Sequence, residues 1–333
     1  MARHEGLPRP IPFRLSKPAL LEALATVDKN RQSTARVLKM ETSFREKIRS
    51  HVESLPTNEA QFRKFNTNPF VLMIHCFKKQ YRHISQIEQD ILPAKIFSSM
   101  ETSAGRMVEA VVLPIYSWQS VPSAMHTASS VIDGKKLSGS TLCLATLKSG
   151  PRCLNDEMSE NIADAIIATS TAWAKGAKVK KIDFTYGVLY GTRRQSNKKD
   201  WHILRNIVEK LPKSAIKVNP RHGWTCEYAK DGVKVTVTVR IGIELWNYIA
   251  GNEMAFVELC VALIRACVAP SDTQPGDHEF TIVDLEEIIS LGPVSSDFNI
   301  SILQRSQLEW LFLFAHHFCD QLLDQDQTEV ERE

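Results

Sequence analysis

A carboxylate and a lysine flank a strand-like run near the middle of the chain. The run is TLCLATLK, which ends at Lys148, and Asp133 lies upstream of it. Because side chains alternate along a strand, Leu142, Leu144 and Thr146 are expected to share a face with Lys148. The sequence therefore predicts a cation at the end of an otherwise apolar strand, followed at once by Ser-Gly-Pro.

The connection between the two charged residues is expected to be a hairpin. A short strand-like run covers Ser129–Asp133, and Asp133-Gly134 is a dipeptide typical of tight turns. A hairpin would bring Asp133 beside Lys148 from a neighbouring strand. A carboxylate binds Mg²⁺, which prefers oxygen ligands and substrate phosphate, while a lysine orients the attacking water and offsets charge developing on the phosphate. The pair predicts metal-dependent hydrolysis of a phosphodiester.

This arrangement resembles the active site of the PD-(D/E)xK nuclease superfamily, especially that of type II restriction endonucleases. In these enzymes an Asp on one strand is followed on the next strand by an acid, any residue and a lysine, which Asp133 and Lys148 match in spacing. The continuation LKSGPRCLND resembles a Lys-Ser-Gly-Pro…Asn segment found in a subset of restriction endonucleases. The resemblance covers residues 97–201.

The resemblance implies both a fold and an activity. It implies a restriction-endonuclease-like core, in which a mixed β-sheet is flanked by helices. It also implies Mg²⁺-dependent, sequence-specific cleavage of double-stranded DNA that leaves 5′-phosphate ends. A homodimer reading a palindromic site is expected, because two-fold protein symmetry matches two-fold DNA symmetry. The family further implies a cytoplasmic protein of a prokaryote and a restriction-modification role.

The chain departs from the family at the second acid, which would fall at Thr146. A replacement can come from an upstream helix, where Glu101, Gly105 and Glu109 share one face and Gly105 permits close approach to the sheet. The two glutamates lie about 12 Å apart along that helix, so one ion takes one of them. Glu109 is favoured because its apolar neighbours place it against the core. Glu160, on the helix after the lysine, matches a permuted version of the site.

Other interpretations of these residues stay open. The Asp-Gly pair is typical of a plain hairpin turn, Lys148 is also typical of a strand-end lysine that reaches solvent, and Glu101 and Glu109 are compatible with a solvated helix face. For the whole protein, one alternative is a repair or recombination nuclease built on the same core. The other, favoured by the missing acid, is a non-catalytic DNA-binding protein with a nuclease-like fold.

A strongly basic block supports a DNA partner. The formal net charge is only +3, but the segment from Lys175 to Arg221 has thirteen Lys and Arg against three acids, so the remainder is acidic. Arg, Gln and Asn read base edges, and Lys contacts phosphates. One loop in the block combines these types, and the DNA contacts predicted from it are Arg193, Arg194, Gln195, Asn197, Lys198 and Lys199.

The elements that must position these residues form an α/β or α+β fold. Expected helices are a first one beginning near Ser16, then Ser43–Leu55, Pro69–Tyr81, Ser103–Val112, a helix capped by Asn155 or Asp156, Trp201–Leu211 and Leu245–Val268. Expected strands are Ser129–Asp133, Thr141–Lys148, Lys181–Tyr190 and Val233–Ile241. We divide the chain into a helical region at 1–95, a catalytic and DNA-recognition core at 96–323 and an acidic tail at 324–333.

Several classes of protein find no support in the sequence. There is no GxxxxGK[ST] or GxGxxG motif, so no nucleotide cofactor is expected. The seven cysteines are odd in number and lack CxxC spacing, which favours reduced thiols in an intracellular protein. No apolar stretch suits a membrane span, and no signal peptide is expected.

Overall fold

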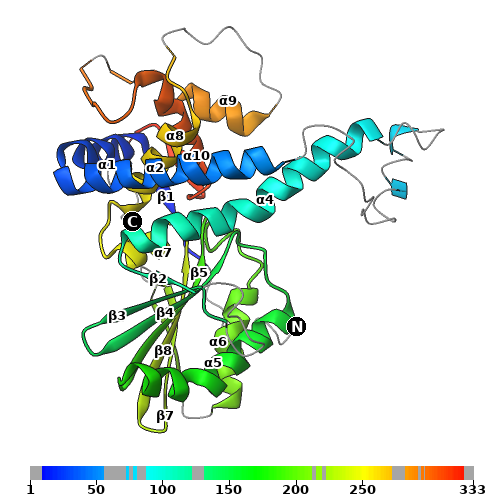
Figure 1. Cartoon of the computed structure of the whole chain (residues 1–333), viewed down its shortest axis with the longest axis vertical. Helices are drawn as coiled ribbons and strands as arrows, with labels where there is room; N and C mark the ends of the chain where they lie inside the picture. Colours follow the sequence, from blue (N-terminus) through cyan, green and yellow to red (C-terminus); the bar gives the residue numbers. More distant parts are fainter. Residues whose placement is uncertain are drawn as a thin grey trace, which may run out of the picture.

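A mixed β-sheet lies beneath a layer of helices in the computed structural model, and the long helix α4 (Glu88–Ile115) runs between the two (Figure 1). The structure describes residues 10–55, 73–74, 78–80, 88–121, 131–211, 215–219, 223–271, 282–291, 294–295 and 297–325. Most of the predicted helix Pro69–Tyr81 and most of the acidic tail lie outside these residues. No helix within the described ranges is both long and apolar enough to cross a membrane.

Seven strands in the described part of the chain form the sheet, in the order β2-β3-β4-β5-β8-β7-β6. Their bounds are β2 (Gln119–Ser120), β3 (Gly134–Ser138), β4 (Thr141–Lys148), β5 (Lys181–Val188), β6 (Ala215–Asn219), β7 (Gly223–Lys230) and β8 (Val233–Ile241). Strands β4, β5 and β8 are parallel, and the other pairs are antiparallel. The parallel strands end together at what we call the carboxyl edge and begin together at the opposite amino edge.

Two helices, α5 (Asp156–Ala177) and α6 (Lys199–Lys210), pack on one face of the sheet. Alternation along the strands sends Leu144, Phe184 and Val237 to this face, where they join one core cluster with residues of both helices. As predicted, Asn155 caps α5, because its side chain accepts a hydrogen bond from the backbone amide of Met158 at 2.7 Å. Helix α5 is the crossover that makes β4 and β5 parallel.

The helical layer joins both ends of the described chain. It contains α1 (Lys17–Lys29), α2 (Arg31–Ser54), α7 (Ile243–Ala250), α8 (Ala255–Cys267), α9 (Val283–Ser290) and α10 (Leu308–His316). Its apolar core cluster includes Phe44 from α2, Val112 from α4, Trp246 from α7 and Phe312 from α10. A short parallel pair between β1 (Arg14–Ser16) and β9 (Gln321–Leu323) also ties the two ends together. The N-terminal helices therefore share a core with the C-terminal ones.

A buried ionic group strengthens the contact between three helices of this layer. The side chain of Glu258 on α8 is fully buried and accepts hydrogen bonds from the guanidinium of Arg36, at 2.7 and 2.5 Å. The hydroxyl of Tyr116, just after α4, donates to the same carboxylate at 2.6 Å. A buried carboxylate needs such partners, since an isolated buried charge is costly.

The mixed α/β fold class is confirmed, and so are the strands Thr141–Lys148 and Val233–Ile241. Helix boundaries are less well predicted. Helix α2 was predicted to begin at Ser43 but begins at Arg31, because the side chain of Asn30 caps it there. The predicted helix Leu245–Val268 is two helices, because the chain turns at Gly251 with φ of 68°. Strands β6 and β7 were not predicted.

Candidate active site at the carboxyl edge of the sheet

Asp133 lies beside the end of β4, although not in the predicted hairpin turn. Residues 131–133 are not a strand, and Gly134 begins β3 instead of forming a turn. The actual turn contains Gly139, whose φ of 56° suits glycine. Antiparallel pairing of Gly134 with Ala145 nevertheless carries Asp133 to the far end of β4. The prediction of a turn at Asp133-Gly134 was therefore wrong, while the proximity of Asp133 to the end of β4 is confirmed.

Two hydrogen bonds with the backbone of β4 position Asp133, and one of them reaches its carboxylate. The Asp133 amide donates to the carbonyl of Ala145 at 2.8 Å. The amide of Leu147 donates to Oδ2 of Asp133 at 2.7 Å. Because a carboxylate oxygen held by a backbone amide stays oriented, Asp133 is positioned by the same strand that ends in Lys148.

Helix α4 approaches this strand end closely at Gly105. A Cβ placed on Gly105 would lie 3.2 Å from the Cβ of Ser149, the residue after Lys148. That distance is tighter than ordinary van der Waals contact, so glycine permits the approach, as the sequence predicted. Glu109 lies one helical turn further along the same face of α4.

The structure brings Glu109 together with Asp133 and Lys148. Burial raises the pKa of Glu109 to about 7, with a further contribution from the negative charge of Asp133. The positive charges of Lys148 and Arg106 act in the opposite direction. Three segments far apart in the sequence thus place two carboxylates and a lysine within electrostatic reach of one another. A carboxyl group with a pKa near 7 gives up its proton when a cation approaches.

The two alternative acids lie in different surroundings. Glu101 is exposed on α4, two helical turns before Glu109. Glu160 is exposed on α5, where it pairs with Lys210 of α6 at 3.0 Å. Thr146, at the family's second acid position, is buried, and its hydroxyl donates to the carbonyl of Val131. The charge of Glu109, by contrast, couples to those of Asp133 and Lys148.

The donor set at this edge fits Mg²⁺ only together with a substrate. No group of three or more His, Cys, Asp and Glu side chains is arranged to hold a metal among the described residues. Mg²⁺ is commonly held by one or two carboxylates, with waters and substrate phosphates completing its shell. Asp133 and Glu109 supply two carboxylates whose mutual repulsion a cation would relieve. They would hold such an ion.

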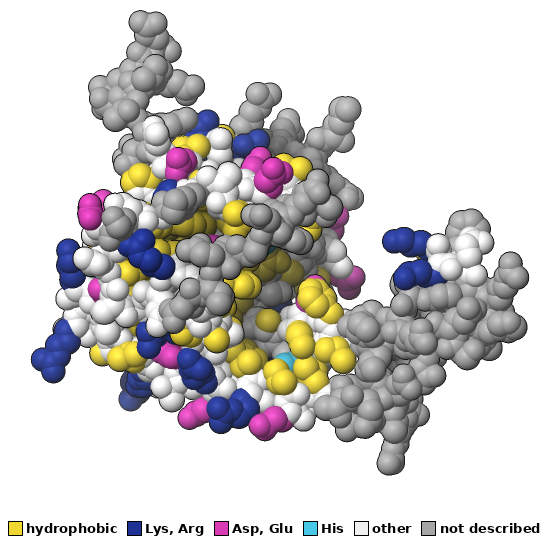
Figure 2. All heavy atoms as spheres, turned by 90° about the horizontal axis from the view of Figure 1, so that it is seen from above, with side chains coloured by type: hydrophobic (Ala, Val, Ile, Leu, Met, Phe, Trp, Pro, Cys, Tyr) yellow, Lys and Arg dark blue, Asp and Glu magenta, His cyan; other side chains and the backbone are white. Residues whose placement is uncertain are grey.

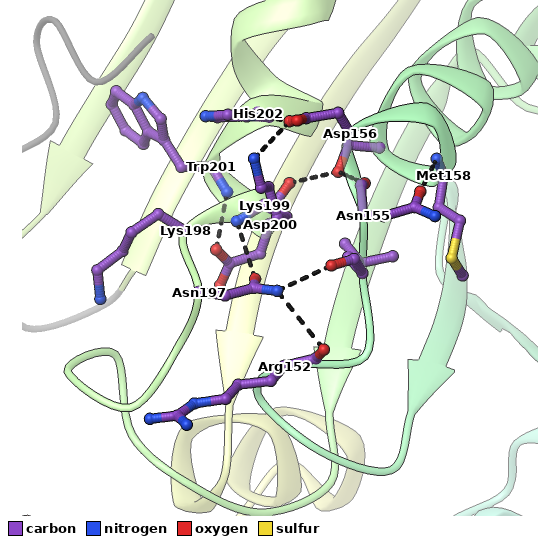
Figure 3. A network of polar contacts seen from close by, with 12 residues as sticks. Arg152, Asn155, Asp156, Met158, Asn197, Lys198, Lys199, Asp200, Trp201 and His202 are labelled. Carbon is purple, nitrogen blue, oxygen red and sulfur yellow. Dashed lines mark hydrogen bonds and ion pairs between the residues drawn. The ribbon is translucent and has the colours of Figure 1, made fainter. Parts of the chain in front are cut away.

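Two loops next to the site are bonded to each other (Figure 3). The first follows Lys148, and the second joins β5 to α6. The side-chain amide of Asn197 donates to the carbonyl of Leu154 at 2.8 Å, and its backbone amide donates to the carbonyl of Pro151 at 3.2 Å. The guanidinium of Arg152 donates to the carbonyl of Gln195 at 3.2 Å. The second loop therefore supports the Ser-Gly-Pro loop that follows the candidate lysine.

Most of the side chains predicted to contact DNA are engaged within the protein. Arg193 pairs with Glu244 and lies over the ring of Trp224, 4.9 Å from its centroid. Lys199 pairs with Asp156 at 2.6 Å. The other internal contacts are those of Lys198 with the Arg193 carbonyl, of the Gln195 side chain with the Thr192 amide, and of Asn197 with the first loop. Of the six, Arg194 is the exposed one.

A buried carboxylate explains part of this loop's conformation. Asp200, predicted as the cap of a helix beginning at Trp201, lies instead inside the first turn of α6, which begins at Lys199. The hydroxyl of Ser196 and the amide of Trp201 each donate to its Oδ1 at 2.9 Å. Burial raises the pKa of Asp200, while these hydrogen bonds oppose the shift. The prediction of Asp200 as the cap was wrong because Lys198, with φ of 66°, takes that position.

The basic block does not form one surface. Lys175, Lys178, Lys180 and Lys181 lie around the start of β5, at the amino edge, whereas Arg194 lies beyond its end. The described residues on the helical side of the molecule do not form a continuous basic patch either. Figure 2 shows their Lys and Arg side chains dispersed among acidic and hydrophobic ones. The basic block is continuous in sequence, but β5 runs through it and separates these lysines from Arg194.

Arg106 belongs to the site but was not predicted. It is exposed on α4, adjacent to Gly105 and three residues before Glu109, so it lies on the same side of the helix. Its charge lowers the pKa of Glu109. The spacing of three between Arg106 and Glu109 was a signal that could have identified it.

No family model and no curated protein sequence matches the chain.

Proposed function

We propose that the protein is a Mg²⁺-dependent endonuclease that cuts double-stranded DNA at a specific sequence, as type II restriction enzymes do. One observation carries the proposal, namely the convergence of Glu109, Asp133 and Lys148 at the end of β4. The arrangement of the strands also supports the resemblance to these enzymes. Asp133 comes directly before β3 and Lys148 ends β4, these two strands pair in a mixed sheet flanked by helices, and α4 packs against the end of β4.

Each of the three residues has a role that follows from its surroundings. Asp133, oriented by the Leu147 amide, and Glu109 would hold Mg²⁺. When bound, Mg²⁺ supplies Lewis acidity that strengthens water as a nucleophile and offsets charge on the phosphate. The Lys148 ammonium orients the attacking water and stabilises the negative charge that develops during attack. Attack of water on phosphorus breaks the bond to the 3′ oxygen, so hydrolysis would leave a 5′-phosphate and a 3′-hydroxyl, as in the family that the chain resembles.

The proposal extends to DNA binding and to the oligomeric state. Arg194 is exposed at the loop beyond β5 and would contact DNA, while Arg193, Gln195, Asn197, Lys198 and Lys199 would act chiefly by shaping that loop. A homodimer bound to a palindromic site is proposed, because two copies of the site are needed to cut both strands symmetrically. A cytoplasmic location in a prokaryote, beside a modification enzyme, belongs to the same proposal.

Plasmid cleavage tests the proposal. Purified protein is incubated with plasmid of mixed sequence in Mg²⁺ and, separately, in EDTA. Discrete fragments in Mg²⁺ alone are expected. Asp133→Asn, whose side-chain oxygen can still accept the hydrogen bond of the Leu147 amide, and Lys148→Ala should each abolish them while the protein stays folded. Ragged degradation would point instead to a repair-type nuclease. Binding without any cutting would leave a non-catalytic DNA-binding protein, and full activity of either variant would reject the site.

A further inference from the structure

Five exposed lysines gather at the amino edge of the sheet, at the end of the parallel strands away from the candidate active site. We call this group the lysine rim, and its members are Lys175, Lys178, Lys180, Lys181 and Lys234. None of them forms an ion pair with an acid in the described part of the chain. Mutual repulsion without such partners disfavours the folded state, so a bound polyanion would stabilise this edge.

Backbone pairing shows that these lysines lie on adjoining segments. Lys181 begins β5 and is in register with Lys234 of β8. The Lys234 amide donates to the carbonyl of Lys180 at 2.9 Å. The nearby carboxylate of Asp231 accepts a hydrogen bond from Thr171 at 3.1 Å, and it is the acid of the adjoining turn between β7 and β8. The rim therefore keeps a positive net charge.

Lys178 occupies a backbone conformation that disfavours a lysine. It ends α5 with φ of 56° and ψ of 41°, in the left-handed region where glycine is the usual helix-terminating residue. A side chain with a Cβ costs energy there. Its ammonium group lies at the C-terminus of α5, where a positive charge interacts favourably with the helix dipole and offsets part of that cost.

The rim is too far from the candidate active site to belong to it. Strand β5 has eight residues, and at about 3.3 Å per residue its ends lie about 23 Å apart. Because DNA is stiff over such short lengths, a duplex lying on the carboxyl edge would need a costly bend to reach the amino edge. A separate segment of duplex can reach the rim without that bend.

We propose that the lysine rim binds the phosphate backbone of a second segment of duplex DNA, independently of the segment cut at the carboxyl edge. The choice of DNA over another polyanion rests on the proposed nuclease function. The contacts are to phosphates, because ammonium groups of lysine neutralise phosphates without reading base sequence.

Salt-dependent binding tests this proposal. A fluorescein-labelled duplex of unrelated sequence is titrated with the full chain in EDTA, at several salt concentrations, with anisotropy as the readout. Each phosphate neutralised contributes about 0.9 to the slope of log K against log salt, so Lys178→Gln/Lys181→Gln/Lys234→Gln should lower the slope by about 2 to 3. The matched control, Lys29→Gln/Arg31→Gln/Lys39→Gln, removes three exposed charges from α1 and α2 and should leave the slope unchanged.

Lys178→Gly separates binding from folding. Glycine suits the left-handed conformation, so the melting temperature should stay the same or rise, while the slope should fall by about 0.9. Equal slopes for wild type and the rim variant would overturn the proposal. The rim variant can also be tested with polyglutamate. If it no longer binds polyglutamate but still binds DNA as wild type does, the proposal would be overturned in favour of an acidic protein partner.

The outcome is independent of catalysis. A chain that never cuts plasmid, yet shows the slope change in the rim variant alone, would reject the proposed nuclease function and retain the rim as a DNA-binding surface. A chain that cuts in Mg²⁺ but shows no slope change would reject the rim and retain the nuclease function.

Discussion

The two edges of the central sheet carry charge in opposite ways. At the carboxyl edge, Glu109, Asp133 and Lys148 combine both signs of charge at partly buried positions, and the pKa of Glu109 rises to about 7. At the amino edge, the lysine rim carries one sign of charge at exposed positions. Partial burial of opposed charges shifts protonation equilibria, whereas exposed like charges act through long-range attraction that salt screens. The first arrangement suits chemistry and the second suits binding.

The strongest way to break this comparison is to neutralise Glu109. Glu109→Gln keeps the size of the side chain and removes one of the two carboxylates proposed to hold Mg²⁺. Cleavage of plasmid should fall by about a hundredfold or more, as it does when a group that stabilises developing charge is lost. Initial rates of plasmid cutting in Mg²⁺ measure the effect.

Two matched changes serve as controls for that variant. Glu101→Gln removes a carboxylate from an exposed position on the same helix, and Glu160→Gln removes one that pairs with Lys210. Both should keep cleavage within a few-fold of wild type. Loss of cleavage in either control, with Glu109→Gln active, would move the metal-binding acid to that residue.

A smaller effect is expected from Gly105→Ala, which tests whether α4 must approach the strand end. An added methyl would meet the Cβ of Ser149 at 3.2 Å and push the helix, with Glu109, away from Asp133. Misplacement of a catalytic group by a fraction of an ångström should lower the rate by roughly tenfold. The melting temperature should change little, because alanine favours a helix while the contact opposes it. An unchanged rate would show that the close approach is unimportant for activity.

The neighbouring arginines of the loop beyond β5 should respond differently from each other. Arg193→Ala removes the pair with Glu244 and the contact with Trp224, which should cost about 2 kcal/mol of unfolding free energy. Arg194→Ala changes an exposed side chain and should leave stability within about 0.5 kcal/mol while weakening DNA binding. Urea denaturation and anisotropy measure the two quantities. Equal losses of stability would contradict the assignment.

A pH-dependent shift in stability that involves Glu109 is also expected. Its pKa is about 7 in the fold and near 4.5 when unfolded, so the folded state retains a proton between these values that the unfolded state has lost. The contribution of Glu109 to stability is therefore present at low pH and is lost as pH rises towards 7. In EDTA at pH 8, Glu109→Gln should melt a few degrees above wild type, and at pH 4 the difference should disappear.

Mg²⁺ should reverse this pH trend in wild type. Because the ion competes with the Glu109 proton, its stabilising effect should be larger at pH 8 than at pH 6. Glu109→Gln should show little Mg²⁺-dependent stabilisation at either pH. The melting temperature measured with and without Mg²⁺ at the two pH values checks both statements, and a larger effect at pH 6 would contradict them.

Local patterns predicted the parts of the fold that depend on neighbouring residues. The alternation in Thr141–Lys148 and the cap at Asn155 were sufficient, and β4 and α5 lie where they were expected. The turn at Asp133-Gly134 was mistaken because an Asp-Gly pair and the Gly139 turn are both compatible with a hairpin, and pairing with β4 decides between them.

The candidate site shows the same limit. Asp133 and Lys148 were predicted from spacing and Glu109 from its apolar neighbours, and the fold brings the three together. The loop from Arg193 to Lys199 was predicted as a DNA-reading surface because composition gives residue types but not their partners. Glu244, Trp224 and Asp156, which engage it, come from distant segments, and only the tertiary fold reveals those contacts.

The most direct test of the account is the position of a bound metal ion. Crystals of the protein grown with Mn²⁺, which takes the same oxygen ligands as Mg²⁺, give an anomalous signal that locates the ion. A peak is expected within coordination distance of carboxylate oxygens from both Asp133 and Glu109, with Lys148 adjacent. A peak held by Glu101 or Glu160, or an ordered site at the carboxyl edge with no peak at saturating Mn²⁺ and bound DNA, would contradict it.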